Sequence, residues 1–284
     1  MKILNKKTLS DIQGVKVTSM DIHAPLLAVK AEPGQFIAVM AVEHGERIPL
    51  TIVDSIPGKG IITIIFQEVG LTTKLLGRLS VGDCLYSLVG PLGHPTQISN
   101  YGKVVLVGGG VGIAEIYPVA KAFKKAGNKV IIIIGARSKE LLILEKELKA
   151  VSDELHIATD DGSYGKKGFV TELLQAVIAR SKATKQSPSD DKILVYAVGP
   201  IPMMKSVSAV TKPAGIKTLV SLNALMVDAT GMCGCCRVTV GNETKFSCVD
   251  GPDFDAHLVD WDELVKRSRI YIDKEKHICN LNKL

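Results

Sequence analysis

The feature that most constrains the fold is a change of pattern at Lys103, after which short apolar runs alternate with stretches of helical periodicity. The apolar runs have the length of buried strands, and they are Val104–Val107, Lys129–Ile134, His156–Thr159, Ile193–Ala197 and Thr218–Ser221. Helical stretches separate them near Ile113–Lys125, Lys139–Ala150, Phe169–Arg180 and Pro202–Val210. Apolar strands joined by helical crossovers are typical of a parallel sheet that is buried on both faces. The sequence therefore predicts a doubly wound α/β domain over residues 101–222.

Residues 1–100 follow a different pattern, in which short β-rich runs alternate with Gly/Pro turns. The runs are Val15–Met20, Gln35–Val42, Leu50–Val53, Gly60–Phe66 and Cys84–Val89, and one helical stretch, Thr72–Leu79, interrupts them. Strands at this spacing, with little helical periodicity between them, favour a small antiparallel β-barrel. Residues 223–284 are loop-rich and contain most of the cysteines, which predicts a small C-terminal module.

The cysteines of the C-terminal region have a spacing that is typical of an iron–sulfur site. Cys233, Cys236 and Cys248 form the pattern C-x2-C-x11-C, and Asp228 is separated from Cys233 by a four-residue spacer. A plant-type [2Fe–2S] motif begins C-x4-C-x2-C, so the pattern predicts such a cluster with a carboxylate in place of the first thiolate. Asp228, Cys233, Cys236 and Cys248 are the predicted ligands, and the cluster would make the chain an electron carrier.

Two alternatives use this region differently. Cys235 in place of Asp228 would give four thiolate ligands, although Cys235 and Cys236 are adjacent and would both have to reach one site. The C-x2-C pair also suits a structural zinc site, here in a nucleotide-binding sensor without catalytic activity. The colour of the protein separates the zinc alternative from a brown-yellow flavin and iron–sulfur protein.

A glycine-rich segment, Val107–Glu115, follows a predicted strand and opens a predicted helix. Glycines let the backbone approach a pyrophosphate, and the free N–H groups of a helix N-terminus favour an anion. The segment departs from a strict G-x-G-x-x-G, but its strand–turn–helix context predicts nucleotide binding, with a tight structural turn as the alternative. The predicted binding residues are Gly108, Gly109, Gly110 and Gly112.

Further loops follow the other strands, at the edge where an open parallel sheet binds ligands. Arg137 and Ser138 follow the second strand and are predicted to hold the adenosine ribose or a 2′-phosphate. No acidic residue ends that strand, so the carboxylate typical of NAD sites is missing and NADP is not excluded. The third strand is followed by Asp160, whose alternative role is an ordinary Asx turn. The fourth strand is followed by Gly199, Pro200 and Met203.

Composition excludes several classes of function. The net charge of +6 is spread along the chain without a basic stripe or a reading motif, so nucleic-acid binding is not expected. No apolar run is long enough to span a bilayer and no secretory pattern opens the chain, so we expect no membrane insertion. Clustered cysteines suit metal binding in a reducing compartment, and we expect a cytoplasmic protein. The polar segment Ser181–Asp191 is expected to form an exposed loop.

The whole chain resembles the ferredoxin–NADP reductase superfamily, and its predicted parts follow one another in the order barrel, nucleotide domain and [2Fe–2S] module. That superfamily binds FAD on its barrel through Arg-x-x-Ser/Thr, with Gly-x-x-Ser/Thr-x-x-Leu on the flavin pyrophosphate. The segment Arg47–Thr51 is similar to the first pattern with one extra residue, and Gly70–Leu76 fits the second. The resemblance implies flavin contacts from Arg47, Pro49, Leu50, Thr51, Gly70, Thr72 and Thr73, with Thr51 near flavin N5. It implies no catalytic side chain, because the flavin itself transfers the hydride.

More narrowly, the chain is similar to the iron–sulfur flavoprotein subunits of two kinds of complex. Dihydroorotate dehydrogenase electron-transfer subunits use cysteine as the first cluster ligand. The small subunit of NADH-dependent reduced ferredoxin:NADP oxidoreductase, also called sulfide dehydrogenase beta subunit, has Asp-x4-Cys-x2-Cys-x11-Cys, which Asp228 matches. The second resemblance implies electron transfer between NAD(P)H, FAD and a [2Fe–2S] cluster, with a larger flavin and iron–sulfur subunit as partner and NAD(H) as the favoured nucleotide. The complex that this resemblance implies is of the electron-bifurcating kind in one form of the hypothesis. A dihydroorotate-type or hydrogenase-associated diaphorase subunit is the alternative.

Overall fold

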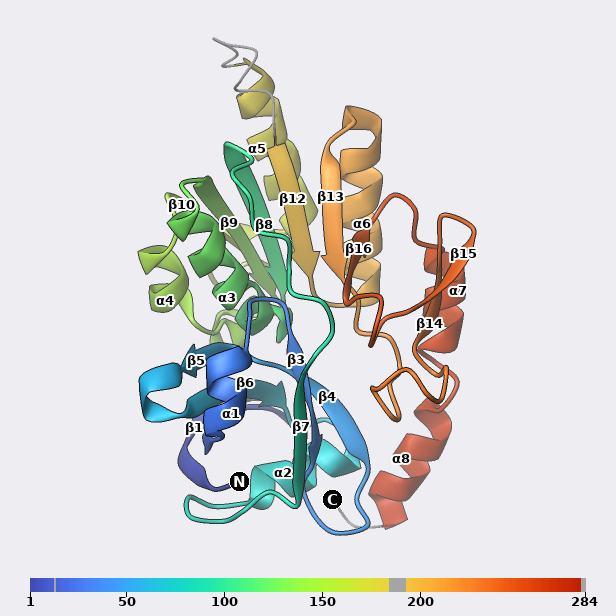
Figure 1. Cartoon of the computed structure of the whole chain (residues 1–284). Helices are drawn as coiled ribbons and strands as arrows, with labels where there is room; N and C mark the ends of the chain where they lie inside the picture. Colours follow the sequence, from blue (N-terminus) through green and yellow to red (C-terminus); the bar gives the residue numbers. More distant parts are fainter. Residues whose placement is uncertain (13, 184–192, 282–284) are drawn as a thin grey trace. The chain divides into compact units, whose positions relative to one another are not determined.

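The computed structural model of the chain describes residues 1–12, 14–183 and 193–281 (Figure 1). The chain divides into two compact units, each assembled from segments that are distant in sequence. Unit 1 consists of residues 1–95, 223–252 and 260–284, and unit 2 consists of residues 96–222 and 253–259. The division into three parts at residues 100 and 222 stays a prediction. Most of the predicted Ser181–Asp191 loop lies outside the described residues.

Two antiparallel sheets form the N-terminal region of unit 1, where the sequence predicts a barrel. One has the strand order β1-β2-β6-β5, and its strands are β1 (Ile3–Ile12), β2 (Val15–His23), β5 (Asp54–Ile56) and β6 (Ile61–Gln67). The other has the order β4-β3-β7, with β3 (Phe36–Met40), β4 (Arg47–Thr51) and β7 (Ser87–Leu92). Short helices connect them: α1 (Pro25–Lys30), η1 (Pro57–Lys59) and α2 (Leu71–Arg78). The predicted antiparallel β architecture is confirmed.

The core of these sheets follows the two-residue period of a strand. Its fully buried side chains include Met20, Ile22, Ile37, Ile62 and Ile64. Strand β1 is absent from the prediction because its sequence is mostly polar, and only Ile3 and Ser10 in it are buried. Helix α1 is also absent from it, since six residues are too few to establish a helical period.

Unit 2 contains a seven-stranded sheet with the order β11-β10-β9-β8-β12-β13-β16. The predicted strands pair in parallel as β8 (Lys103–Gly109), β9 (Lys129–Ala136), β10 (Glu154–Thr159), β12 (Ile193–Val198) and β13 (Lys217–Ser221). The short strand β11 (Lys166–Lys167) adds in parallel beside β10, and β16 (Asp253–Asp255) adds antiparallel beside β13. The predicted doubly wound parallel sheet is therefore confirmed.

Helices cover both faces of this sheet (Figure 1). They are α3 (Gly112–Lys125), α4 (Glu145–Ala150), α5 (Val170–Ala183) and α6 (Ile201–Thr211), with the short helix η4 (Lys212–Ala214) after α6. The predicted continuous helix over Lys139–Ala150 is wrong. Only η2 (Lys139–Leu141) and α4 are helical there, because Leu144 has a φ of +56° and stops the helix from extending toward the N-terminus. Within the described residues, no helix is long and apolar enough to cross a membrane.

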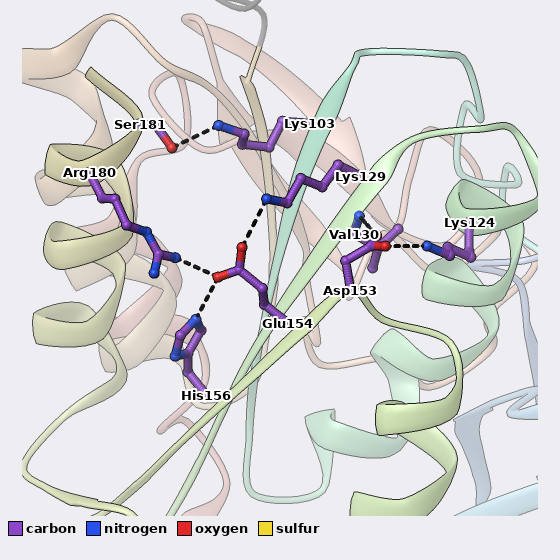
Figure 2. Close-up of polar contacts among 9 residues, drawn as sticks. All are labelled: Lys103, Lys124, Lys129, Val130, Asp153, Glu154, His156, Arg180 and Ser181. Carbon is purple, nitrogen blue, oxygen red and sulfur yellow. Dashed lines mark hydrogen bonds and ion pairs between the residues drawn. The ribbon is translucent and has the colours of Figure 1, made fainter. Parts of the chain in front are cut away.

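Ion pairs join β9, β10 and α5 at the amino ends of the strands (Figure 2). The Glu154 carboxylate lies 3.0 Å from Lys129 Nζ and 3.3 Å from His156 Nε2, and it also contacts the Arg180 guanidinium. Burial raises the pKa of Glu154, but the hydrogen bond and charge of Lys129, with the charge of Arg180, outweigh it and lower that pKa to about 2. The network lies at the amino ends of the strands, away from the edge where an open parallel sheet binds ligands. We therefore infer that it stabilises unit 2.

A second polar cluster in unit 2 is centred on the buried carboxyl group of Asp253. Thr96 Oγ1 donates a hydrogen bond to it over 2.6 Å and the Tyr196 hydroxyl donates another over 3.0 Å, while Ser221 supplies a third. Burial nevertheless raises the pKa of Asp253 to about 6. The same burial, together with the nearby Asp253 charge, raises the pKa of Tyr196 well above its usual value.

We expect Asp253→Asn to stabilise the protein at pH 8 by roughly 1–3 kcal/mol, since each pKa unit corresponds to about 1.4 kcal/mol. The pKa of Asp253 is higher in the folded than in the unfolded chain, so protonation favours folding. The wild-type protein therefore loses stability as the pH rises from about 4 to about 6, and the variant does not. Urea unfolding of both proteins between pH 4 and pH 8 measures the difference. Asp255→Asn, on the same strand, is the control; equal pH dependence in wild type and Asp253→Asn would contradict the prediction.

The C-terminal part of unit 1 is a hairpin followed by helices. Strands β14 (Arg237–Val240) and β15 (Glu243–Phe246) pair antiparallel, and α7 (Trp261–Arg267) and α8 (Ile272–Leu281) follow. The Asp260 side chain caps α7 by accepting hydrogen bonds from Asp262 N and Glu263 N. The Arg267 guanidinium donates a hydrogen bond to the Cys235 carbonyl over 2.9 Å, which ties α7 to the cysteine-rich loop.

Candidate functional site

The predicted nucleotide-binding edge of unit 2 lies at the carboxyl ends of its parallel strands. Strand order runs from β8 through β9 to β10 on one side, and the chain then returns to β12 on the other side of β8. Ligands bind at such a switch point in open α/β sheets. Two of the predicted loops meet there, namely 108–112 after β8 and 199–203 after β12.

Close packing explains the glycines at this switch point. A Cβ atom on Gly112 would lie 2.5 Å from the Val198 carbonyl oxygen, and one on Gly109 would lie 2.4 Å from Met203 Sδ. Gly110 has a φ of +57°, which glycine adopts without strain. Helix α3 can therefore begin directly at the strand end, where its free N–H groups favour the phosphates of a nucleotide.

The loops after β9 and β10 are held together at the same edge. Asp160 N donates a hydrogen bond to the Ala136 carbonyl and Asp161 N donates one to the Arg137 carbonyl, each over 3.1 Å. The structure thus places the predicted residues Arg137, Ser138 and Asp160 on adjoining loops, next to the switch point. Their contacts with the nucleotide stay a prediction.

The predicted flavin residues come from two segments of unit 1 that a hydrogen bond joins. Arg47, Pro49, Leu50 and Thr51 are all on β4. Thr72 Oγ1, near the N-terminus of α2, donates a hydrogen bond to Glu46 Oε2 over 3.3 Å, just before β4 begins. Glu46 is absent from the prediction, because nothing in the sequence spacing connects it with Thr72.

Gly70 and Thr73 form the start of α2. Thr73 Oγ1 accepts hydrogen bonds from Val69 N and Gly70 N, both over 3.0 Å, so its hydroxyl ties the residues that precede the helix to its first turn. The N-cap residue is a glycine, which has no side chain to bind the N–H groups of that turn, so the helix N-terminus beside a strand that carries Arg47 is a suitable place for the flavin pyrophosphate. These residues therefore fit FAD, and their individual roles stay predictions.

The predicted cluster ligands lie on one loop and one hairpin of unit 1. Cys236 and Cys248 are both buried, and their sulfurs are 3.2 Å apart. Cys233 is exposed, and the backbone N–H groups of Cys235 and Asp228 lower the pKa of its thiol. Burial and the hydrogen bond with Cys236 raise the pKa of the Cys248 thiol to about 12, and the Gly231 N–H opposes this shift. Backbone N–H groups directed at sulfur are among the hydrogen bonds that adjust iron–sulfur sites, so the donor set fits such a cluster.

Asp228 occupies a turn of its own in this structure. Its Oδ2 accepts hydrogen bonds from Thr230 N over 3.1 Å and Met232 N over 3.2 Å, and from the Thr230 hydroxyl. The Thr230 hydroxyl most strongly lowers the pKa of Asp228, and the positive charge of Arg47 adds to the effect. Strand β4, which carries the predicted flavin residue Arg47, and the loop that carries Asp228 are thus close enough for their charges to interact.

The full set of four ligands stays a prediction. In the part of the chain that the structure describes, no three side chains of His, Cys, Asp or Glu converge on a point that could hold a metal ion. The free thiols of Cys236 and Cys248 contact each other, whereas the thiol of Cys233 interacts with that of Cys235.

Two family profiles match the chain in these regions. The iron–sulfur cluster binding domain of dihydroorotate dehydrogenase B matches residues 223–260. The oxidoreductase NAD-binding domain matches residues 106–209. The matches cover the predicted cluster ligands and the predicted nucleotide loops.

Similar proteins cover nearly the whole chain. The dihydroorotate dehydrogenase B (NAD(+)) electron transfer subunit homolog of Thermotoga maritima is 48% identical over 255 residues, which are 90% of this chain and 87% of that protein. The dihydroorotate dehydrogenase B (NAD(+)) electron transfer subunit of Fusobacterium nucleatum subsp. nucleatum is 33% identical over 261 residues, covering 89% of this chain and 96% of its own length.

Solved structures agree with these matches. A chain from the structure of NADH-dependent reduced ferredoxin-NADP oxidoreductase, described for its insights into flavin-based electron bifurcation, superimposes with a TM-score of 0.86 at 44% identity, covering 97% of this chain and 95% of that one. Ferredoxin-NADP+ reductase from Plasmodium falciparum superimposes with a TM-score of 0.60 at 14% identity, covering 74% of this chain and 91% of the other, and shows the same fold.

Proposed function

We propose that this chain, which belongs to the family of dihydroorotate dehydrogenase B electron-transfer subunits, carries electrons between NADH and a larger flavin and iron–sulfur subunit. It is an oxidoreductase subunit with an FAD-binding fold, an NAD-binding domain and an iron–sulfur domain. The assembly that we propose is a heterodimer or a larger complex, in which neither subunit completes the reaction alone. The free cysteines suit a reducing compartment such as the cytoplasm.

The residues of each unit have separate tasks in this proposal. Bound FAD exchanges the two electrons of a hydride for the single electrons that an iron–sulfur cluster carries. In unit 2, the 108–112 loop and the N-terminus of α3 hold the NAD(H) phosphates, and the 199–203 loop positions the nicotinamide. In unit 1, Arg47 and the start of α2 hold the flavin phosphates, and Thr51 orients the flavin ring. No side chain has to donate or accept a proton, so these residues act by binding and orientation.

The observation that carries the proposal is the superposition on a chain of NADH-dependent reduced ferredoxin-NADP oxidoreductase over 97% of this chain. Asp228 supports the same assignment, because the sequence pattern of that small subunit contains this aspartate. The second candidate is a dihydroorotate dehydrogenase electron-transfer subunit. The iron–sulfur domain match over residues 223–260 and the relative that is 48% identical favour it.

Isolation of the native complex separates the two candidates. The chain is tagged in its own cells and purified anaerobically, and its partner is identified by mass spectrometry. We expect the complex to reduce NADP+ when NADH and reduced ferredoxin are supplied together. A complex that reduces NAD+ with dihydroorotate, and does not reduce NADP+, would assign the chain to the second candidate.

A further inference from the structure

The hairpin of β14 and β15 carries a buried hydroxyl beside two of the predicted cluster ligands. Its register pairs Arg237 with Phe246, so the residue before Arg237, which is Cys236, lies opposite Ser247. Ser247 N donates a hydrogen bond to the Cys236 carbonyl over 3.1 Å, which extends the pairing to these two residues. Residues that lie opposite each other in an antiparallel pair place their side chains on the same face, with Cβ atoms about 5 Å apart. The Ser247 hydroxyl is therefore on the same face as the Cys236 sulfur.

A two-residue turn holds this register. Gly241 and Asn242 connect the two strands, and their φ values of +58° and +68° are both positive, as a type I′ turn requires. The burial of β14 shows which face of the hairpin is covered. Cys236 and Val238 are each 2% exposed, whereas Arg237 between them is exposed. Because residues two apart on a strand share a face, the face that carries Cys236 is the buried one.

The second buried cysteine reaches the same place because the chain turns directly after Ser247. Asp250 N donates a hydrogen bond to the Phe246 carbonyl over 2.7 Å, which closes the turn. The Cys248 sulfur then lies 3.2 Å from that of Cys236. Ser247 thus precedes one predicted ligand in the chain and lies opposite the other across the hairpin.

The Ser247 hydroxyl has no hydrogen-bond partner among the residues that the structure describes. Its side chain is fully buried, and an unpaired buried hydroxyl costs free energy. The sulfur of a neutral thiol is only a weak acceptor. A thiolate or sulfide of an iron–sulfur cluster is negatively charged, and hydrogen bonds to ionised groups are the stronger ones. An unpaired donor beside Cys236 and Cys248 therefore suits a site that holds such a cluster.

We propose that the Ser247 hydroxyl donates a hydrogen bond to a sulfur of the [2Fe–2S] site and thereby raises the reduction potential of the cluster. Reduction adds one negative charge to the cluster, so a donor directed at sulfur stabilises the reduced form more than the oxidised form. Ser247 is not a ligand in this proposal, and the four predicted ligands keep their places. The inference rests on the proposed function, because only a chain that binds a cluster gives this hydroxyl an acceptor.

The test is a redox titration of the anaerobically purified full chain with its FAD and cluster, followed by electron paramagnetic resonance of the reduced cluster. Ser247→Ala should lower the ratio of reduced to oxidised cluster at a fixed potential roughly tenfold, which corresponds to about 59 mV for one electron. Ser247→Thr keeps a hydroxyl and should stay closer to the wild-type potential. Ser10→Ala is the matched control, because Ser10 on β1 is also buried and its hydroxyl also has no partner within the described residues. We expect this control to keep the wild-type potential.

The midpoint potentials and the iron content decide the outcome. Iron analysis should give the same cluster content in all four proteins, and loss of iron in Ser247→Ala alone would overturn the inference, since the hydroxyl would then be needed to hold the cluster. A wild-type potential in Ser247→Ala would overturn it too and leave the proposed function intact. An equal fall in Ser247→Thr or in Ser10→Ala would also overturn it, because the effect would not depend on the hydroxyl at this position. A wild-type chain without a cluster signal after dithionite reduction would overturn the proposed function itself.

Discussion

Cys236→Ser is expected to remove the [2Fe–2S] cluster and to slow electron transfer out of the flavin by more than about 100-fold. Loss of a residue that merely supports a metal ligand already costs 10–100-fold in metal affinity or activity, and loss of a ligand should cost more. Cys236 is buried, its sulfur is 3.2 Å from that of Cys248, and β14 begins at the next residue. The backbone at Cys236 is thus fixed, and another thiol cannot easily take its place.

The measurement is electron paramagnetic resonance of the dithionite-reduced variant, with iron analysis of the same sample. Cys84→Ser is the matched control, because Cys84 is an exposed thiol outside the motif. We expect the control to keep the full signal. A full signal in Cys236→Ser would contradict the predicted ligand set.

The fourth ligand is tested by the same method. Cys235→Ser should keep the cluster if Asp228 is the ligand, whereas Asp228→Ala should lose it. Asp228→Cys should keep a cluster with a changed reduction potential, since a thiolate replaces a carboxylate. Loss of the cluster in Cys235→Ser, with retention in Asp228→Ala, would assign the fourth position to Cys235.

Gly112→Ala is expected to weaken NADH binding at least about tenfold and to lower the free energy of unfolding by about 2 kcal/mol. The added Cβ would lie 2.5 Å from the oxygen and 2.8 Å from the carbon of the Val198 carbonyl. Both are backbone atoms at the end of β12, so the N-terminus of α3 has to move instead. That movement displaces the N–H groups that are predicted to hold the phosphates.

NADH titration and urea unfolding of the same variant measure the two effects. Gly58→Ala is the control, because its Cβ would meet nothing within 4 Å and its φ is not in the left-handed region. Unchanged NADH binding in Gly112→Ala would show that the start of α3 is not part of the nucleotide site.

Features that depend on local pattern were predictable from the sequence. The central strands of unit 2 are apolar along most of their length, and Val104, Val105, Leu106 and Val107 are fully buried in β8. Such runs indicate a buried parallel strand without knowledge of the neighbours. The glycine-rich loop was also predictable from local sequence, because its strand, turn and helix are consecutive in the chain.

Features that depend on contacts between distant residues were not predictable. Asp253 acquires its raised pKa from burial beside Thr96 and Tyr196, and only the tertiary fold brings these residues together. The break at Leu144 also left no clear mark, because leucine is a good helix former and its positive φ is imposed by its surroundings.

The most direct test of the account is low-temperature electron paramagnetic resonance of the anaerobically purified full chain, reduced by NADH alone. We predict the signal of a reduced [2Fe–2S] cluster, because the nucleotide site, the flavin and the cluster then form one path for electrons. A signal with dithionite but none with NADH would contradict that path. No signal with either reductant would contradict the presence of the cluster itself.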